Sequence, residues 1–308
     1  MASLLLPKSE INTLAKHVKE TTEKLLKLHP KTPEPVVFFL AGRLPGEALL
    51  HQKQLTLFAM ICNLPGNILN SIALKLLTSS PQNSRNWFAN IKNLCFTYNL
   101  PHPLTLLKFP PKKHAFKNQV KANILDFWQS KLRAHAATLE DRSLKYFKPH
   151  YMSLSRPHPM WLIADNSYKV NKCITVARML SGRFRCGSLI RHFYPHVSGI
   201  CELCHEALED LPHILVPHCP RLKEKAGHLL AAARAMLADS ELTADIFNTH
   251  ITSKDNHKIV QFFLDPSSFP DVIAAEQNQK GTLALLLGVT TTWCHSLNRT
   301  RIKLIGSK

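Results

Sequence analysis

The chain has 308 residues, of which 45% are hydrophobic, so it can fold around a core and is not a wholly disordered protein. It carries 39 Lys and Arg against 21 Asp and Glu, a formal net charge of +18. Such an excess of positive charge repels itself unless a polyanion is near, so the composition favours nucleic acid as the partner.

Neither a secretion signal nor a membrane span is expected. The N-terminal apolar run is three leucines followed closely by Lys8, and the longest apolar stretch, residues 283–289, is too short to cross a bilayer. We therefore expect an intracellular protein of the nucleus or cytoplasm, with no membrane partner. Thiols stay reduced there, so the eight cysteines indicate core residues or metal ligands. Four with apolar neighbours are expected in the core: Cys62, Cys95, Cys173 and Cys294.

Hydrophobic residues recur at helical spacing almost throughout, and prolines separate the segments. Ser84 is the expected cap of a helix that turns Trp87 and Ile91 inward. The expected fold class is therefore mainly α, a multi-helix array. The other predicted helices, in chain order, are residues 9–28, 46–62, 67–77, 112–137, 166–181, 221–238 and about 276–304.

The helix at 112–137 combines an apolar stripe with a basic face. The stripe is Phe116, Val120, Ile124, Phe127 and Leu132. Lys113, Lys117 and Lys121 recur every four residues on a neighbouring face, with no acidic residue at partner spacing. This face is either solvated or in contact with phosphates.

Residues 138–164 lack a long periodic pattern and form an aromatic- and proline-rich connector. Its aromatic residues are expected to pack the loop, or alternatively to stack on unpaired bases. They are Tyr146, Phe147, Tyr151 and Trp161.

The predicted helix at 166–181 ends before Gly182, a natural C-terminal cap. Arginines gather on this helix and just after it, ahead of the next cysteines. We expect four of them to contact nucleic acid: Arg178, Arg183, Arg185 and Arg191.

Residues 201–220 read CELCHEALEDLPHILVPHCP and have the composition of a metal site. Cys201 and Cys204 lie three apart, and His213 and Cys219 follow. Thiolates and imidazoles at such distances are ligands of one tetrahedral, structural Zn²⁺. His218 is the alternative fourth ligand, and Cys219 is preferred because a thiolate neutralises more of the ion's charge.

The side chains near these ligands are expected to be peripheral. His205 is expected to face solvent. Three nearby acidic residues are expected on a surface loop rather than acting as a general base beside a catalytic metal: Glu206, Glu209 and Asp210.

This part of the chain resembles the C-terminal region of reverse transcriptases from non-LTR (LINE-type) retrotransposons. The resemblance rests on ARMLSGRFRCGSLIRHF, the Cys-x2-Cys pair and EDLPHILVPHCP. In that family a helix ending in an SGR turn precedes a Cys-Cys-His-Cys zinc knuckle. Four further segments resemble other parts of the same region. They are LPGEALLHQKQLTLFAMICNLP, RNWFANIKNLCFTYNLPHP, LKYFKPHYMSLSRPHPMW and WCHSLNRTRIKLIG. The resemblance covers most of residues 37–308.

The resemblance implies a segment that holds RNA or DNA, alone or with other proteins encoded by the element, while a separate polymerase domain does the synthesis. It assigns the knuckle ligands as Cys201, Cys204, His213 and Cys219. The family usually has four residues between the ligand His and the last Cys of the knuckle. This chain has five, as if Pro217 were inserted, so His218 remains an alternative fourth ligand.

No enzymatic activity is expected. Polymerase chemistry needs carboxylates to hold two divalent ions, and the chain contains no pair of adjacent aspartates. The alternatives are a zinc-stabilised protein-interaction module and a degenerate, non-functional fragment of a retroelement. Four segments are expected: an N-terminal helical region resembling the thumb segment (1–110), the basic helix and connector (111–165), the zinc-binding region (166–225) and a helical tail (226–308).

Overall fold

The computed structural model describes residues 8–64, 68–79, 86–140, 144–216 and 218–307. Within these ranges the chain forms fifteen α-helices, three short 3-10 helices and no strand, so the expected mainly α fold is confirmed. The one β-type pairing among them is an isolated antiparallel bridge between Ile200 and Leu208. None of the described helices combines the length and apolarity that a membrane span requires.

The chain forms two compact units, each gathered from separated stretches of sequence. The four segments predicted from the sequence instead follow one another along the chain. The first unit comprises Met1–Thr22, Gly42–His135 and Leu154–Arg156, and the second comprises Glu23–Ala41, Ala136–Ser153 and Pro157–Lys308.

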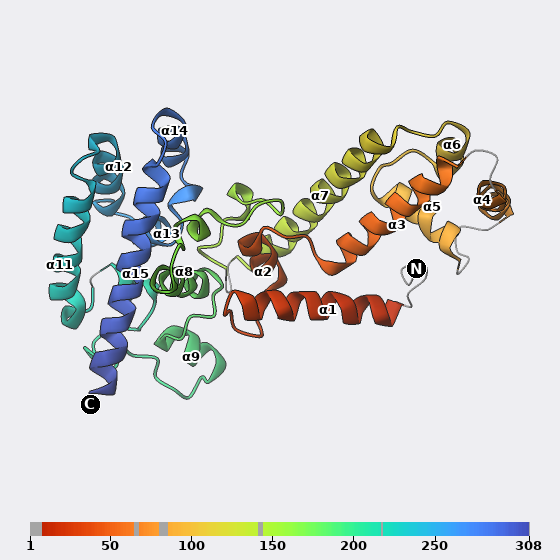
Figure 1. Ribbon diagram of the computed structural model, residues 1–308. Coiled ribbons are helices and arrows are strands. Elements are labelled where there is room, and N and C mark those ends of the chain that lie inside the picture. The colour runs from red at the N-terminus through yellow and green to blue at the C-terminus, as the bar shows by residue number, and fades with distance from the viewer. Residues whose placement is uncertain (1–7, 65–67, 80–85, 141–143, 217, 308) are drawn as a thin grey trace. The chain divides into compact units, whose positions relative to one another are not determined.

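The first unit packs around a buried tyrosine. Its helices, coloured red to yellow-green in Figure 1, are α1 (Lys8–Leu25), α3 (Gly46–Cys62), α4 (Ile68–Ser79), α5 (Trp87–Thr97), α6 (Pro103–Lys108) and α7 (Lys113–Ala137). The Tyr98 hydroxyl lies 2.7 Å from His51 Nδ1 and accepts a hydrogen bond from Trp128 Nε1 at 3.1 Å. Asn123 donates to the Tyr98 carbonyl at 2.8 Å, so α3 and α7 both hydrogen-bond to the tyrosine that follows α5.

The apolar stripe of α7 was predicted correctly except at one position. Phe116, Val120, Ile124 and Leu132 are buried, whereas Phe127 is only half-buried and Trp128 takes the core position. The steps from 120 to 124, 128 and 132 keep one helix face inward, and residue 127 lies to the side of that face.

The second unit is built around its last helix. Figure 1 shows α15 running through it with α11 alongside. The aromatic ring of Phe263 stacks on Trp293 of α15, with the ring centroids 4.7 Å apart. The helices of this unit are α2 (Glu34–Ala41), α8 (Ser167–Leu180), α9 (Gly187–Phe193), α10 (Leu211–Leu215), α11 (Pro220–Leu237), α12 (Glu241–Ile251), α13 (Asn256–Leu264), α14 (Pro270–Asn278) and α15 (Thr282–Gly306), with 3-10 helices at Pro149–Tyr151, Pro159–Ile163 and Pro266–Ser268.

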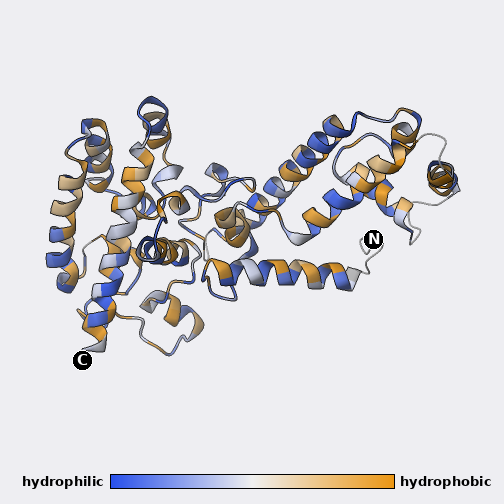
Figure 2. Ribbon diagram, viewed as in Figure 1, coloured by the Kyte–Doolittle hydropathy of each residue, from blue (hydrophilic) through white to orange (hydrophobic). Residues whose placement is uncertain are grey.

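Several elements were not predicted from the sequence. The helices α2, α6, α9, α10, α12 and α13 were missed. Helix α2 carries no amphipathic pattern because it is hydrophobic on all sides and buried (Figure 2). The expected helix at about 276–304 is instead α14 and α15, separated at Gly281, whose φ is +96°. Ser84 lies outside the described residues, and the observed cap of α5 is Asn86, which accepts from the Ala89 N–H at 2.8 Å.

The predicted connector aromatics have mixed environments. Tyr146 and Phe147 are buried, and Trp161 is half-buried with its Nε1 donating to the Leu40 carbonyl at 3.0 Å. Tyr151 is exposed, so its predicted packing role is wrong. The four cysteines assigned to the core are all buried, and burial raises the pKa of each thiol.

Candidate metal centre

The first two ligand candidates lie in a tight hairpin, here called the knuckle loop (residues 199–209). The Cys201 N–H donates to the Ala207 carbonyl at 2.8 Å, and the His205 N–H donates to the Cys201 carbonyl at 2.9 Å. His205 itself has a φ of +58°, the left-handed conformation that closes such a turn. The turn brings both sulfur atoms of the Cys-x2-Cys pair to the same side.

The third ligand candidate lies on the short helix α10. Asp210 caps this helix by accepting from the His213 N–H at 2.8 Å. Trp293 Nε1 of α15 donates to the carbonyl of Leu215 at the other end of α10, at 3.0 Å. These two contacts hold the His213 ring against the knuckle loop.

Cys219 precedes α11 and occupies its N-cap position. Its N–H donates to the His213 carbonyl at 3.3 Å, which folds the segment after α10 back toward the other ligands. Pro217, the residue that looked inserted relative to the retrotransposon pattern, lies outside the described residues.

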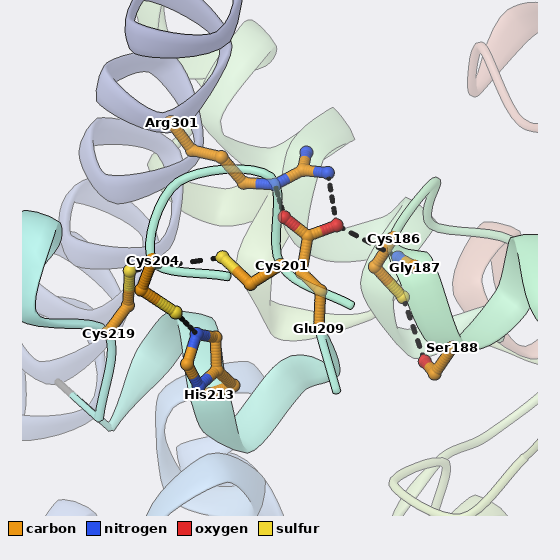
Figure 3. Close-up of polar contacts among 9 residues, drawn as sticks. All are labelled: Cys186, Gly187, Ser188, Cys201, Cys204, Glu209, His213, Cys219 and Arg301. Carbon is orange, nitrogen blue, oxygen red and sulfur yellow. Dashed lines mark hydrogen bonds and ion pairs between the residues drawn. The ribbon is translucent and has the colours of Figure 1, made fainter. Parts of the chain in front are cut away.

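The four side chains converge on one point (Figure 3). One ligand atom from each of Cys201, Cys204, His213 and Cys219 lies within 4.8 Å of all the others, so the cluster could hold a metal ion. The sulfur atoms of Cys201 and Cys219 are 3.9 Å apart, and Cys204 Sγ is 3.4 Å from His213 Nε2. A tetrahedral ion with metal–sulfur bonds of about 2.3 Å separates its ligands by about 3.7 Å. The Cys201–Cys219 and Cys204–His213 distances are both close to that value.

The two other histidines of the segment are not in this cluster. His218 and His205 are both exposed, whereas His213, Cys201 and Cys219 are buried. Four protein ligands fill a tetrahedral shell, which leaves no open position for water or substrate.

The ligand groups have perturbed acidities. Burial, together with a smaller contribution from the neighbouring Cys201 thiol, raises the pKa of the Cys219 thiol to about 12. Burial acts to raise the pKa of Cys204, but hydrogen bonds with the backbone of Glu206 and Ala207 and with the Cys201 and Cys219 thiols together lower it overall. Burial lowers the pKa of His213, which favours the neutral imidazole, the form that binds metals.

A buried ion pair lies beside the cluster (Figure 3). Glu209 was expected on a surface loop, and that expectation is wrong, because only 3% of the residue is exposed. Arg301 of α15 donates to both of its carboxylate oxygens, at 2.6 Å each, and the Gly187 N–H donates to one of them at 2.8 Å. Burial lowers the pKa of Arg301, but the bonds from Glu209 outweigh this and raise it overall.

The backbone segments at Gly187 and Gly199 approach each other closely beside this ion pair. A Cβ at Gly187 would lie 2.2 Å from the Gly199 carbonyl oxygen. Gly199 has a φ of +64°, and a Cβ there would lie 2.8 Å from the Gly187 carbonyl oxygen. Sequence reasoning missed both glycines and Arg301, because no local pattern links residues so far apart.

The residues predicted to contact nucleic acid lie in both units. Lys113, Lys117 and Lys121 are exposed on α7 of the first unit, and Arg185 and Arg191 are exposed in the second. Arg178 is exposed and donates through Nε to the Lys27 carbonyl at 3.0 Å. Arg183 is half-buried, with its guanidinium 5.4 Å from the centroid of the Phe193 ring. Among the described residues, none of these seven forms an ion pair with a carboxylate.

Comparison of the chain with family models, with curated proteins and with solved structures finds no match in any of the three.

Proposed function

We propose that the cluster binds one zinc ion in a structural role. Three thiolates and an imidazole are the donor set that selects zinc among the divalent ions common in cells. The closed set of four ligands supports a structural role. On this proposal the ion fastens the knuckle loop to α10 and α11.

Metal analysis of the purified full-length chain tests the zinc proposal. We expect one zinc per chain, lost in Cys219→Ser and retained in His218→Ala. Loss of zinc only in His218→Ala would overturn the ligand assignment, and absence of zinc from the unmodified protein would overturn the proposal.

We further propose that the protein binds nucleic acid, RNA or DNA, mainly through phosphates. The observation that carries this proposal is the set of seven predicted basic residues, none of which is neutralised by a carboxylate among the described residues. Together with the net charge of +18, they provide a field that a polyanion neutralises. Neutralised phosphates release counterions, so the affinity should fall steeply as salt rises.

The test is a filter-binding titration with RNA and with DNA across a range of salt concentrations. We expect the logarithm of the affinity to fall linearly with the logarithm of the salt concentration, with a slope set by the number of phosphates contacted. An affinity that stays flat as salt rises would refute the proposal.

The resemblance described above fits this function. If the resemblance reflects a common origin, the chain is a non-catalytic piece of a LINE-type reverse transcriptase that binds template RNA or target DNA without synthesis. Primer extension with Mg²⁺ and deoxynucleotides is expected to yield no product. Extension by the pure protein would contradict this part of the proposal.

A protein-interaction module is the second candidate function. It is favoured by apolar side chains that are exposed around the knuckle loop. Competition distinguishes the two functions, because heparin or tRNA should displace a partner only if that partner uses the basic surface. The exposed apolar side chains are Phe193, Tyr194, Val197, Ile200 and Leu208.

A further inference from the structure

The contact between α8 and α15 carries polar groups along its length. Lys172 Nζ of α8 donates to Thr292 Oγ1 of α15 at 2.8 Å. One turn further along both helices, Thr175 Oγ1 lies 2.9 Å from His295 Nδ1. These two polar contacts between the helices are here called the α8–α15 seam. The sequence did not predict it, because the bonded residues are 120 positions apart in each case.

The seam leads into a cavity, here called the basic hollow. Its volume is about 790 Å³, and Thr175 belongs both to the seam and to the wall of the hollow. One turn beyond Thr175 and His295, Arg178 and Asn298 also line it. Apolar side chains form part of the wall, among them Leu28, Phe184 and Ile302.

The charge in the basic hollow is positive. Lys27, Arg178, Arg183 and Arg185 line it, and among the described residues none of them pairs with a carboxylate. Arg301 also lines it but is neutralised by Glu209. Negative charge comes from the acidic lining residue Glu202 and from the C-terminal ends of α8 and α15, which contribute about −0.5 each. Set against the four unpaired cations, this leaves about two positive charges in excess.

Two polar atoms at the hollow have no partner. Nε of Arg183 and Oδ1 of Asn298 are buried, and neither makes a hydrogen bond to another described residue. Buried polar atoms are usually satisfied, so these two atoms are exceptions, and both belong to residues that line the hollow.

An exposed aromatic ring lies at the other end of the seam. Tyr168 is 51% exposed, and its ring meets His295 edge-on at 6.1 Å between centroids. Lys172 Nζ lies 4.5 Å from the centroid of the same ring. Nearby Lys169 is paired with Asp165 and adds no net charge.

We propose that Tyr168, the α8–α15 seam and the basic hollow together bind an unpaired nucleic-acid strand, with a base on Tyr168 and phosphates at Arg178 and Arg185. A basic groove combined with an exposed aromatic ring is the arrangement by which proteins hold single strands. Tyr168 and Arg178 are ten residues apart on α8, about 15 Å, the length of about four stacked nucleotides. This inference rests on the proposed nucleic-acid binding and specifies the form of nucleic acid bound.

The test compares affinities of the full-length protein by fluorescence anisotropy. The probes are an oligothymidine of about 12 nucleotides and a duplex of equal length. The protein should bind the single strand more tightly. Arg178→Gln with Arg185→Gln should weaken single-strand binding at least tenfold and reduce the log–log salt slope by about 1.4, because each lost phosphate contact accounts for about 0.7.

A second double variant controls for the loss of charge. Lys223→Gln with Lys225→Gln removes two exposed charges from α11, outside the basic hollow, and should leave the slope unchanged. Tyr168→Leu should weaken single-strand binding about fivefold or more and leave duplex binding unchanged. If the arginine pair melts early, Arg185→Gln alone is used, because Arg185 makes no hydrogen bond within the described structure. Its expected slope change is about 0.7.

The outcomes separate this inference from the proposed function. Equal losses in the two double variants, or tighter binding of the duplex, would overturn the single-strand site while salt-dependent binding still stands. An affinity that does not change with salt would refute nucleic-acid binding itself.

Discussion

Glu209 and Arg301 are 92 residues apart in the chain and form a buried ion pair in which Nε and Nη2 of the arginine each lie 2.6 Å from a carboxylate oxygen. The pair links the knuckle loop to the end of α15. One of the same oxygens also accepts from the Gly187 N–H, so the carboxylate joins three separated segments.

Removal of the arginine should therefore destabilise the second unit. In Arg301→Met the Glu209 carboxylate stays buried without its partner, and breaking such a pair costs about 3–5 kcal/mol. Urea denaturation measures the loss of unfolding free energy. Arg299→Met, at an exposed position on the same helix, is the control and should change stability by less than about 0.5 kcal/mol. Equal effects of the two substitutions would show that the pair contributes nothing specific.

Removal of metal should lower the melting temperature. On the proposed zinc binding, an ion that binds only the folded chain stabilises it by an amount that grows with the logarithm of its affinity, and its removal breaks the direct link between the knuckle loop, α10 and α11. A thermal melt followed by circular dichroism, with and without a chelator, measures the effect. Added zinc should restore the original melt, and Cys219→Ser should melt at the lower temperature with no response to chelator. Identical melts with and without chelator would contradict this expectation.

A methyl group at Gly187 should disturb the packing beside the Cys/His cluster. The added Cβ would lie 2.2 Å from a backbone oxygen, which cannot move aside as a flexible side chain can. We expect Gly187→Ala to cost about 1–3 kcal/mol. The matched control is Gly227→Ala within α11, where nothing lies within 4 Å of the new atom. That change should stabilise the protein by about 0.5–1 kcal/mol, because alanine favours a helix interior. Similar chemical-denaturation midpoints for the two variants would contradict the close approach.

Stability should fall as the pH is lowered, in part because of His51. Burial lowers the pKa of His51, Lys131 lowers it further, and Glu47 opposes them. Between the lowered folded pKa and the unfolded value of about 6.5, the unfolded chain binds more protons than the folded chain. The stabilising contribution is thus fully present above about pH 6.5 and is lost as the pH falls through that window.

His51→Gln should make this dependence shallower. Glutamine does not titrate and keeps a polar group near the Tyr98 hydroxyl, which lies 2.7 Å from His51 Nδ1 in the parent protein. Urea unfolding from about pH 7.5 to about pH 5.5 measures the slope. A dependence should persist in the variant, because burial also lowers the pKa of His257 and His295. An unchanged slope would exclude a contribution from His51.

Local patterns predicted the helices whose hydrophobic residues alternate with polar ones. The buried residues of α5 and most of the stripe of α7 follow directly from helical periodicity. The same logic fails for α2, which is buried on all sides and has no polar face to reveal its period. It also fails at Gly281, because a single left-handed residue breaks a continuous apolar pattern.

The sequence by itself determined the mainly α class, the excess of positive charge and the metal-ligand candidates, with Cys219 and His218 as alternatives for the fourth place. Each depends on residue types and on spacings within about twenty positions. Only the tertiary structure brought the sulfur atoms of Cys201 and Cys219 to 3.9 Å and left His218 exposed, because that choice depends on how α10 and α11 pack. It alone placed Arg301 beside Glu209 and His295 beside Thr175. Such pairs form when helices distant in the chain bury a shared apolar surface, and no local sequence pattern encodes which polar side chains then meet.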